Sequence, residues 1–156
     1  MSTTGLDVFD KTVQTTNIWL DEIMAAMGPD RHVAWHILGA TLRALRDRLP
    51  LDEAAHLGAQ LPLLVRGLYY DQWRPAAGVN KDRHLEEFLA RVADDLKDTR
   101  PVNTRDAVRT VFRVLVTHIA KGQADKVAAT LPAEIRALWP SAEQREPAKE
   151  KAPADG

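Results

Sequence analysis

The chain has 156 residues, 45% of them hydrophobic, which is the composition of one globular domain, and it has no cysteine for disulfides, thiolate metal sites or a cysteine nucleophile. Its 21 Lys and Arg balance 22 Asp and Glu, so no long-range field would attract nucleic acid. No apolar run approaches the length of a membrane span, and the N-terminus lacks a secretory signal pattern, so we expect a cytoplasmic protein without a membrane segment.

The first expected helix ends at Met27, because Gly28-Pro29 stops it. Asp30 is placed to cap a second helix that ends before Pro50. Steps of three and four residues separate the apolar positions of both helices. We therefore expect an inward face on the first helix at Phe9, Val13, Thr16, Leu20, Ile23 and Met27, and on the second at Leu38, Leu42, Leu45 and Leu49.

Two shorter helices are expected next. Asp52 is a candidate cap for the segment AAHLGAQ, and Pro62 starts the segment LLVRGLYY, where its missing N–H costs nothing. No segment alternates apolar and polar residues with the period of a strand. The sequence therefore predicts an all-α fold.

The two halves of the chain repeat one pattern at an offset of 70 residues, from Pro62 to Pro132. Each proline follows a leucine and precedes an arginine by four positions, and the same offset aligns the apolar positions of the second helix. The first helix repeats at an offset of 69, with one residue of slippage in the intervening loop. We predict a tandem duplication of a three-to-four-helix unit, packed as a single-domain helical bundle. The bundle spans residues 8–140, with unit one at about 8–72 and unit two at about 82–140, between a flexible N-terminus (1–7) and a disordered tail (141–156).

The segment AQLPLLVRGLYYDQW at 59–73, followed by HLEEFLARV, resembles a bacterial family known as domain-of-unknown-function family 2267. The resemblance covers roughly residues 8–140 and depends on a helix-starting proline, an arginine and three aromatics at fixed spacing. It implies a small, all-helical bacterial cytoplasmic protein and supplies no activity. The second unit departs from the motif, with Trp139-Pro140 where the first has Tyr69-Tyr70, so a special role of this segment is expected in the first unit alone.

Two histidines, His32 and His36, lie four residues apart on one face of the second helix. That spacing suits a metal ion, but Val33 replaces the glutamate of a His-Glu-x-x-His motif, and no further ligand is tied to the pair. We therefore expect solvent-facing histidines or a partner interface, with no metal and no cofactor. Gly39 beside His36 predicts a low helix surface that a helix of another chain can approach closely.

The aromatic stretch that follows is the second candidate site. Tyr69 is expected in the core, since the repeat aligns it with Trp139. The binding residues expected at the helix end are Tyr70, Asp71, Trp73 and Arg74, and Trp35 is expected to join them. In the alternative interpretation, Trp73 folds back to cover the seam between the units.

Three arginines at a spacing of four, Arg105, Arg109 and Arg113, form a stripe that suits anions or nucleic acid. Nearby carboxylates such as Asp106 favour a solvated, ion-paired face instead, and nucleic-acid binding is not favoured.

No serine triad and no glycine-rich phosphate loop is present. We therefore predict a non-catalytic protein-interaction or scaffold module that binds a protein partner or self-associates, with a homodimer as one form. The first alternative is a small-molecule or metal binder, or an enzyme, with a site at the seam lined by Trp19, Trp35, Tyr69 and Trp73. The second alternative is anion or nucleic-acid binding through the arginine stripe.

Overall fold

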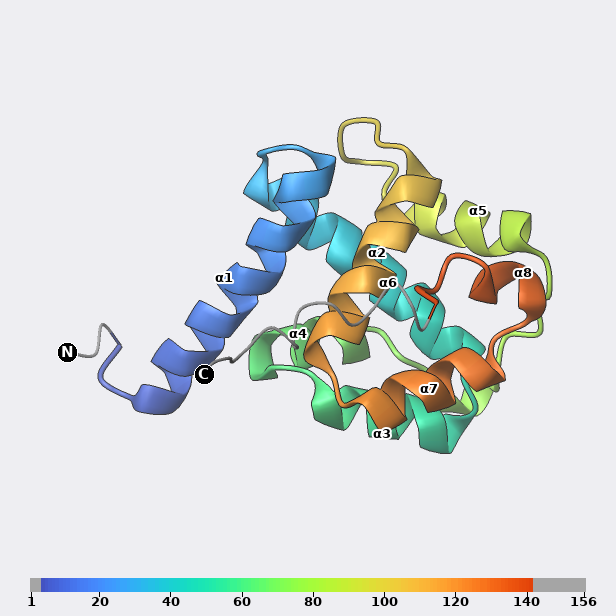
Figure 1. Cartoon of the computed structure of the whole chain (residues 1–156), viewed down its shortest axis with the longest axis horizontal. Coiled ribbons are helices and arrows are strands. Elements are labelled where there is room, and N and C mark those ends of the chain that lie inside the picture. The colour runs from blue at the N-terminus through green and yellow to red at the C-terminus, as the bar shows by residue number, and fades with distance from the viewer. Residues whose placement is uncertain (1–3, 142–156) are drawn as a thin grey trace, which may run out of the picture.

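The computed structural model describes residues 4–141. Over that range the chain is helical without strands (Figure 1), so the predicted all-α class is confirmed. The helices are α1 (Asp7–Met27), α2 (Arg31–Arg48), α3 (Leu51–Gln60), α4 (Leu63–Tyr70), the 3-10 helix η1 (Pro75–Ala77), α5 (Leu85–Asp95), α6 (Thr104–His118), α7 (Lys121–Thr130) and α8 (Ala133–Arg136). In the part described, no helix is both long and apolar enough to span a membrane. Beyond residue 141, the expected tail lies outside the described residues.

The ends of the long helices are set by residues that the sequence identifies. Gly28 ends α1 with a φ of 116°, a conformation that favours glycine. The Asp30 carboxylate accepts hydrogen bonds from the first free N–H groups of α2, which confirms the predicted cap. Pro50 occupies the position before α3, so the expectation that Asp52 caps this helix is wrong, and Asp52 lies in its first turn.

The Leu61–Pro62 and Leu131–Pro132 corners have the same local structure. Both prolines have a φ of −59° and precede the first turn of a short helix, α4 or α8. The Nη2 atom of Arg66 donates to the leucine carbonyl of the first corner at 3.0 Å, and that of Arg136 does so in the second at 2.9 Å. The two corners are therefore equivalent, while duplication of the whole unit stays a prediction.

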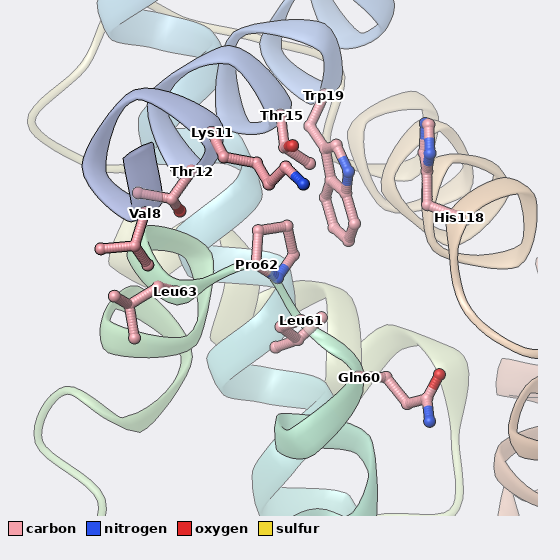
Figure 2. Close-up of a pocket in the computed structure, with 10 residues that line it drawn as sticks. All are labelled: Val8, Lys11, Thr12, Thr15, Trp19, Gln60, Leu61, Pro62, Leu63 and His118. Atoms are coloured by element: carbon pink, nitrogen blue, oxygen red, sulfur yellow. The ribbon is translucent and has the colours of Figure 1, made fainter. Parts of the chain in front are cut away.

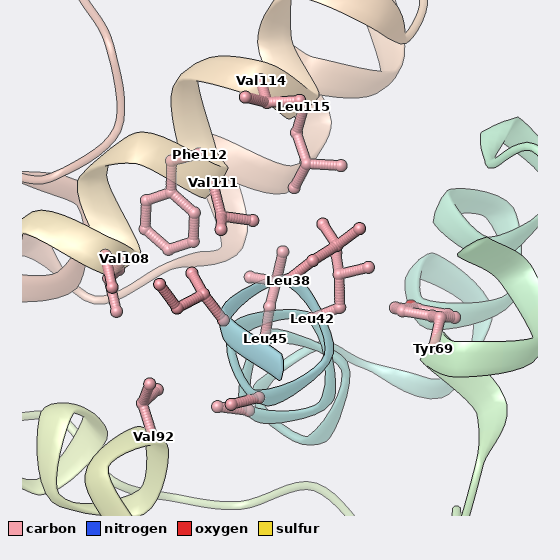
Figure 3. Packing of buried hydrophobic residues seen from close by; sticks show 14 of the residues in the cluster. Leu38, Leu42, Leu45, Tyr69, Val92, Val108, Val111, Phe112, Val114 and Leu115 are labelled. Carbon is pink, nitrogen blue, oxygen red and sulfur yellow. The ribbon is translucent and has the colours of Figure 1, made fainter. Parts of the chain in front are cut away.

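The core surrounds α2, which contacts α1, α4, α5 and α6. Its leucine stripe is buried as predicted, with Leu38, Leu42 and Leu45 fully inaccessible. Figure 3 shows this stripe facing the apolar side chains of α6, with Tyr69 of α4 on another side of α2. Because α2 is covered on several sides, its position fixes the positions of the other helices.

The first half of α1 extends beyond this core (Figure 1). Phe9 and Val13, which were expected on the inward face, are 47% and 43% exposed, so that part of the prediction is wrong. The buried residues of α1 are Thr12, Thr16, Trp19, Leu20 and Ile23. A helix of 21 residues is about 30 Å long, and α2 and α6 are packed around the centre of the fold, so apolar spacing alone did not show where burial stops.

Candidate functional site

A pocket of about 350 Å³ lies beside α1 (Figure 2). Its walls come from α1 between Val8 and Trp19, the corner between α3 and α4, and the last residue of α6. The lining residues are Val8, Lys11, Thr12, Thr15, Trp19, Gln60, Leu61, Pro62, Leu63 and His118. His118 comes from the second half of the chain and the other lining residues from the first, so the pocket joins segments that are far apart in the sequence.

Two side-chain hydrogen bonds hold the walls of the pocket in place. The Thr12 hydroxyl accepts the backbone N–H of Leu64 at 3.2 Å, and the Gln60 side-chain oxygen accepts that of Ala120 at 3.1 Å. Both N–H groups lie at helix starts, where the helix itself offers them no acceptor. These contacts fix α4 to α1 and α3 to the start of α7.

Trp19 forms the buried wall of the pocket. Its side chain is only 1% exposed and stacks on the His118 ring, with 5.2 Å between ring centroids. His118 is held over the indole by a hydrogen bond between its Nε2 and the Glu22 carboxylate, at 2.9 Å. The indole Nε1 has no hydrogen-bond partner within residues 4–141. A buried donor left unpaired costs roughly 1–3 kcal/mol, so this N–H requires an explanation.

The pocket lining contains no carboxylate. Lys11 is exposed and makes no ion pair with any residue that the structure describes. The Thr15 hydroxyl is half-buried and likewise has no hydrogen-bond partner in the described part of the chain. The polar groups free to bind a ligand are therefore mainly donors.

Exposed apolar side chains lie just before and along the first half of α1 and at the start of α4, and two of them, Val8 and Leu63, line the pocket. We call them the α1–α4 apolar surface: Leu6, Val8, Phe9, Val13, Leu63 and Leu64, which are between 43% and 56% exposed. The hydrogen bond from Leu64 to Thr12 joins the two helical segments that carry them. Large apolar groups that stay half-exposed together typically mark an interaction site.

Few features of the sequence indicated the pocket or the α1–α4 apolar surface. Phe9 and Val13 fit a buried stripe, and only the additional apolar residues off that stripe, Leu6, Val8 and Ile18, indicated a helix apolar on more than one side. Lys11 and Thr15 are ordinary helix-surface residues in the sequence, and their role as lining residues depends on where the corner after α3 lies.

The predicted stretch from Tyr70 to Arg74 is organised by a buried arginine. Arg46 is 4% exposed, and its Nη1 donates to the carbonyls of Tyr69 and Asp71 at 2.8 and 2.9 Å. Its guanidinium lies 5.9 Å from the centroid of the Trp73 ring, which stacks on Tyr70 at 5.4 Å. Both aromatics are half-buried, while the expectation that Trp73 covers the seam between the units stays a prediction.

Asp71 and Arg74 remain exposed at this end of α4. Between them, Gln72 has a φ of 63°, an uncommon value for a residue with a side chain. Gln72 and Arg46 line two polar clefts of about 480 and 390 Å³, the second of which also includes Arg74. Ion pairs such as Arg43 with Asp95 connect much of the surrounding charge. Nothing in the sequence distinguished Arg46 from its neighbouring arginines.

The other predicted residues on α2 lie apart from this stretch. His32 and His36 are exposed, as expected, and Trp35 is half-buried. Gly39 is buried, and a Cβ atom at this position would lie 2.9 Å from Cδ1 of Leu68. The expectation that Gly39 leaves an open surface for another chain is therefore wrong, because the helix that approaches it is α4 of the same chain.

The arginine stripe on α6 is exposed. Only Arg109 has an ion pair among the described residues, with Asp106 at 3.9 Å, while Arg105 and Arg113 have none there. Its role in anion binding stays a prediction. Within residues 4–141, no three His, Asp or Glu side chains form a group that could hold a metal ion.

The four aromatics expected to line one seam pocket do not lie together. Trp19 lines the pocket described above, whereas Trp35, Tyr69 and Trp73 are absent from its walls. Tyr69 is fully buried, as predicted, and its hydroxyl donates to the Ala54 carbonyl at 2.6 Å. Burial raises the pKa of this phenol well above its usual value, which keeps the group neutral.

A family model described as an uncharacterised conserved protein, DUF2267, matches residues 16–138. The match extends from the middle of α1 past the end of α8, so it contains Trp19, both corners and His118 but not the first turns of α1. No curated protein matches the chain.

Proposed function

The chain belongs to the DUF2267 family, and we propose that it is a non-catalytic interaction protein that self-associates through the α1–α4 apolar surface. The family description assigns no activity, so the proposal is based on the chain's own residues. The observation that carries it is the exposure of about half of each large apolar side chain at the start of α1 and α4.

Exposed apolar groups of this kind favour association because contact removes them from water. Burying apolar surface contributes roughly 25 cal/mol for each Å². Phe9 and Val13 are separated by four residues and lie on neighbouring positions of α1, which gives another helix a continuous ridge to pack against. Loss of water contact by this ridge is the expected driving force.

A second copy of the chain is the partner that the charge favours. The net charge of −1 offers almost no repulsion between copies, and proteins near zero net charge associate more readily. Two copies related by a twofold axis would each contribute the same surface, which is the commonest form of homo-oligomer. We therefore infer a homodimer.

Sedimentation velocity of the full chain tests the proposal. The double substitution Phe9→Ser and Val13→Ser should convert a dimer to a monomer, because it removes the ridge while leaving the buried residues of α1 unchanged. Leu51→Ser is the matched control, since Leu51 is 54% exposed but lies on α3. We expect the control to sediment like the wild type.

Two results would contradict this proposal. One is a wild-type chain that stays monomeric at about 100 μM, since such weak association lies outside the usual range of specific homodimers. The other is a dimer that persists in the double variant. In that case His36→Ser tests the exposed His32 and His36 face, which stays a prediction.

A further inference from the structure

The pocket beside Trp19 has one polar side rich in hydrogen-bond donors. The Lys11 ammonium and the Thr15 hydroxyl have no partners within residues 4–141, and no acidic side chain lines the pocket to compete for them. The Trp19 Nε1 is also unpaired but is buried, so Lys11 and Thr15 are the donors that a ligand in the pocket can reach. Of these three groups, only the hydroxyl can also accept a hydrogen bond.

The remainder of the lining is largely apolar. In Figure 2, Val8 and Leu63 lie at one end of the pocket, and Pro62 lies beneath the Lys11 side chain. The Lys11 ammonium extends in this view toward Trp19 and Thr15, away from Val8 and Leu63. The pocket therefore has an apolar end and a cationic end.

We propose that this pocket binds a small amphipathic carboxylate, such as a medium-chain fatty acid. The ammonium of Lys11 and the hydroxyl of Thr15 bind the carboxylate, and the apolar chain lies along Pro62 toward Val8 and Leu63. A volume of about 350 Å³ falls within the range of small-molecule sites, which are mostly apolar with a few placed polar groups.

A singly charged ligand fits this site better than a phosphate. The lining has one lysine, and its one histidine already pairs with Glu22. A dianionic phosphate normally recruits several cationic or backbone donors. One ammonium and one hydroxyl match the two oxygens of a carboxylate.

This inference goes beyond the proposed self-association, although Val8 and Leu63 belong both to the pocket and to the α1–α4 apolar surface. Phe9 and Val13 do not line the pocket. The double variant with serine at both positions therefore lacks the proposed interface but keeps the complete pocket. Binding measured in this variant and in the wild type separates the two proposals.

Nuclear magnetic resonance provides a direct readout at the site. The chain has four tryptophans, each with one indole N–H signal, and the signal of Trp19 is identified by its loss in Trp19→Phe. Titration of the full chain with octanoate should move the Trp19 signal in a saturable manner. The uncharged alcohol 1-octanol, which has the same chain length, should bind more weakly.

Lys11→Gln tests the role of the charge while nearly preserving the length of the side chain. Because Lys11 is exposed, the variant is expected to fold. Octanoate affinity should fall about tenfold, the effect of losing one charge-assisted hydrogen bond, whereas 1-octanol affinity should not change. Lys126→Gln, an exposed lysine on α7 outside the pocket, is the matched control and should bind octanoate like the wild type.

Three outcomes would overturn the inference. They are a Trp19 signal that octanoate does not move, octanoate binding that Lys11→Gln leaves unchanged, and 1-octanol binding as tight as that of octanoate. If octanoate binds the double serine variant as it binds the wild type, the pocket acts independently of self-association. That result supports the inference whether or not the chain forms a dimer.

Discussion

Replacement of Arg46 by methionine tests how the end of α4 is held. Among residues 4–141, Arg46 is the one buried side chain that carries a charge. Its Nη1 donates to the carbonyls of Tyr69 and Asp71, just where α4 ends. Methionine fills a similar volume with an apolar group, so Arg46→Met removes the two hydrogen bonds while largely preserving the packing.

The expected loss of stability is about 3 kcal/mol. A hydrogen bond to a charged donor contributes roughly 1.5–3 kcal/mol, and a buried acceptor left unpaired costs a similar amount. Tyr69 is fully buried, so its carbonyl bears most of that cost, whereas Asp71 is exposed and its carbonyl can bind water. The ion pair with Asp47 adds little, because the Asp47 side chain is 44% exposed.

Urea unfolding followed by circular dichroism measures this difference. Arg43→Met is the control on the same helix: Arg43 pairs with the half-exposed Asp95, and its bond to the Leu68 carbonyl is long at 3.4 Å, so a loss below about 1 kcal/mol is expected. Arg46→Lys should recover only part of the stability, since an ammonium lacks the planar donor geometry. An Arg46→Met variant that unfolds like the Arg43 control would refute the reasoning.

Three further outcomes follow from the packing and from one ion pair. Gly39→Glu should lower the free energy of unfolding by about 2 kcal/mol or more in denaturant titrations, because the new side chain meets Leu68; equal stability would contradict the observed contact. Tyr69→Phe should cost about 1 kcal/mol for its lost hydrogen bond, measured in the same assay, and a stabilised variant would argue against a well-made bond. The hydrogen bond with Glu134 raises the pKa of His84, so Glu134→Gln should lower that pKa in a nuclear magnetic resonance titration. The contribution of His84 to stability is full below the usual histidine pKa and is lost as the pH rises through the raised pKa of the folded protein. A His84 pKa that is the same in Glu134→Gln as in the wild type would exclude the contact between His84 and Glu134 in solution.

The pH dependence of the contribution that Glu134 makes to stability has the opposite sign. Two hydrogen bonds lower the pKa of Glu134: the larger effect comes from the Leu85 N–H and the smaller from the His84 side chain. Its contribution to stability is therefore present above the usual glutamate pKa and is lost as pH falls through the lowered value. The contact between α5 and α8 should be strongest when both side chains are charged, between the two pKa values.

Local chemistry made several features predictable from the sequence. The cap at Asp30, the stop at Gly28 and the helix start after Pro62 depend on backbone groups within a few residues. The leucine stripe of α2 was predictable because α2 is covered by neighbours along its length. The family resemblance is likewise confirmed over residues 16–138.

The predictions that were wrong depended on contacts between helices and not on local chemistry. Phe9 and Val13 have the right spacing for a buried face, but burial also requires a neighbouring helix, and the start of α1 extends past most of the core. Gly39 lacks a side chain, which indicates a close approach by another helix without identifying the chain to which that helix belongs. The sequence pattern contains no information on either neighbour.

Only part of the candidate site could be predicted from the sequence. Trp19 was predicted to line a pocket because it is a large aromatic residue. Lys11, Thr15 and His118 join it only because the corner at Leu61–Pro62 lies against both α1 and the end of α6. The sequence by itself determined the helices, their ends and the composition of the core, since these depend on interactions among near neighbours in the chain. Only the tertiary structure decided which apolar and cationic groups remain exposed together, because that depends on contacts between residues far apart in the sequence.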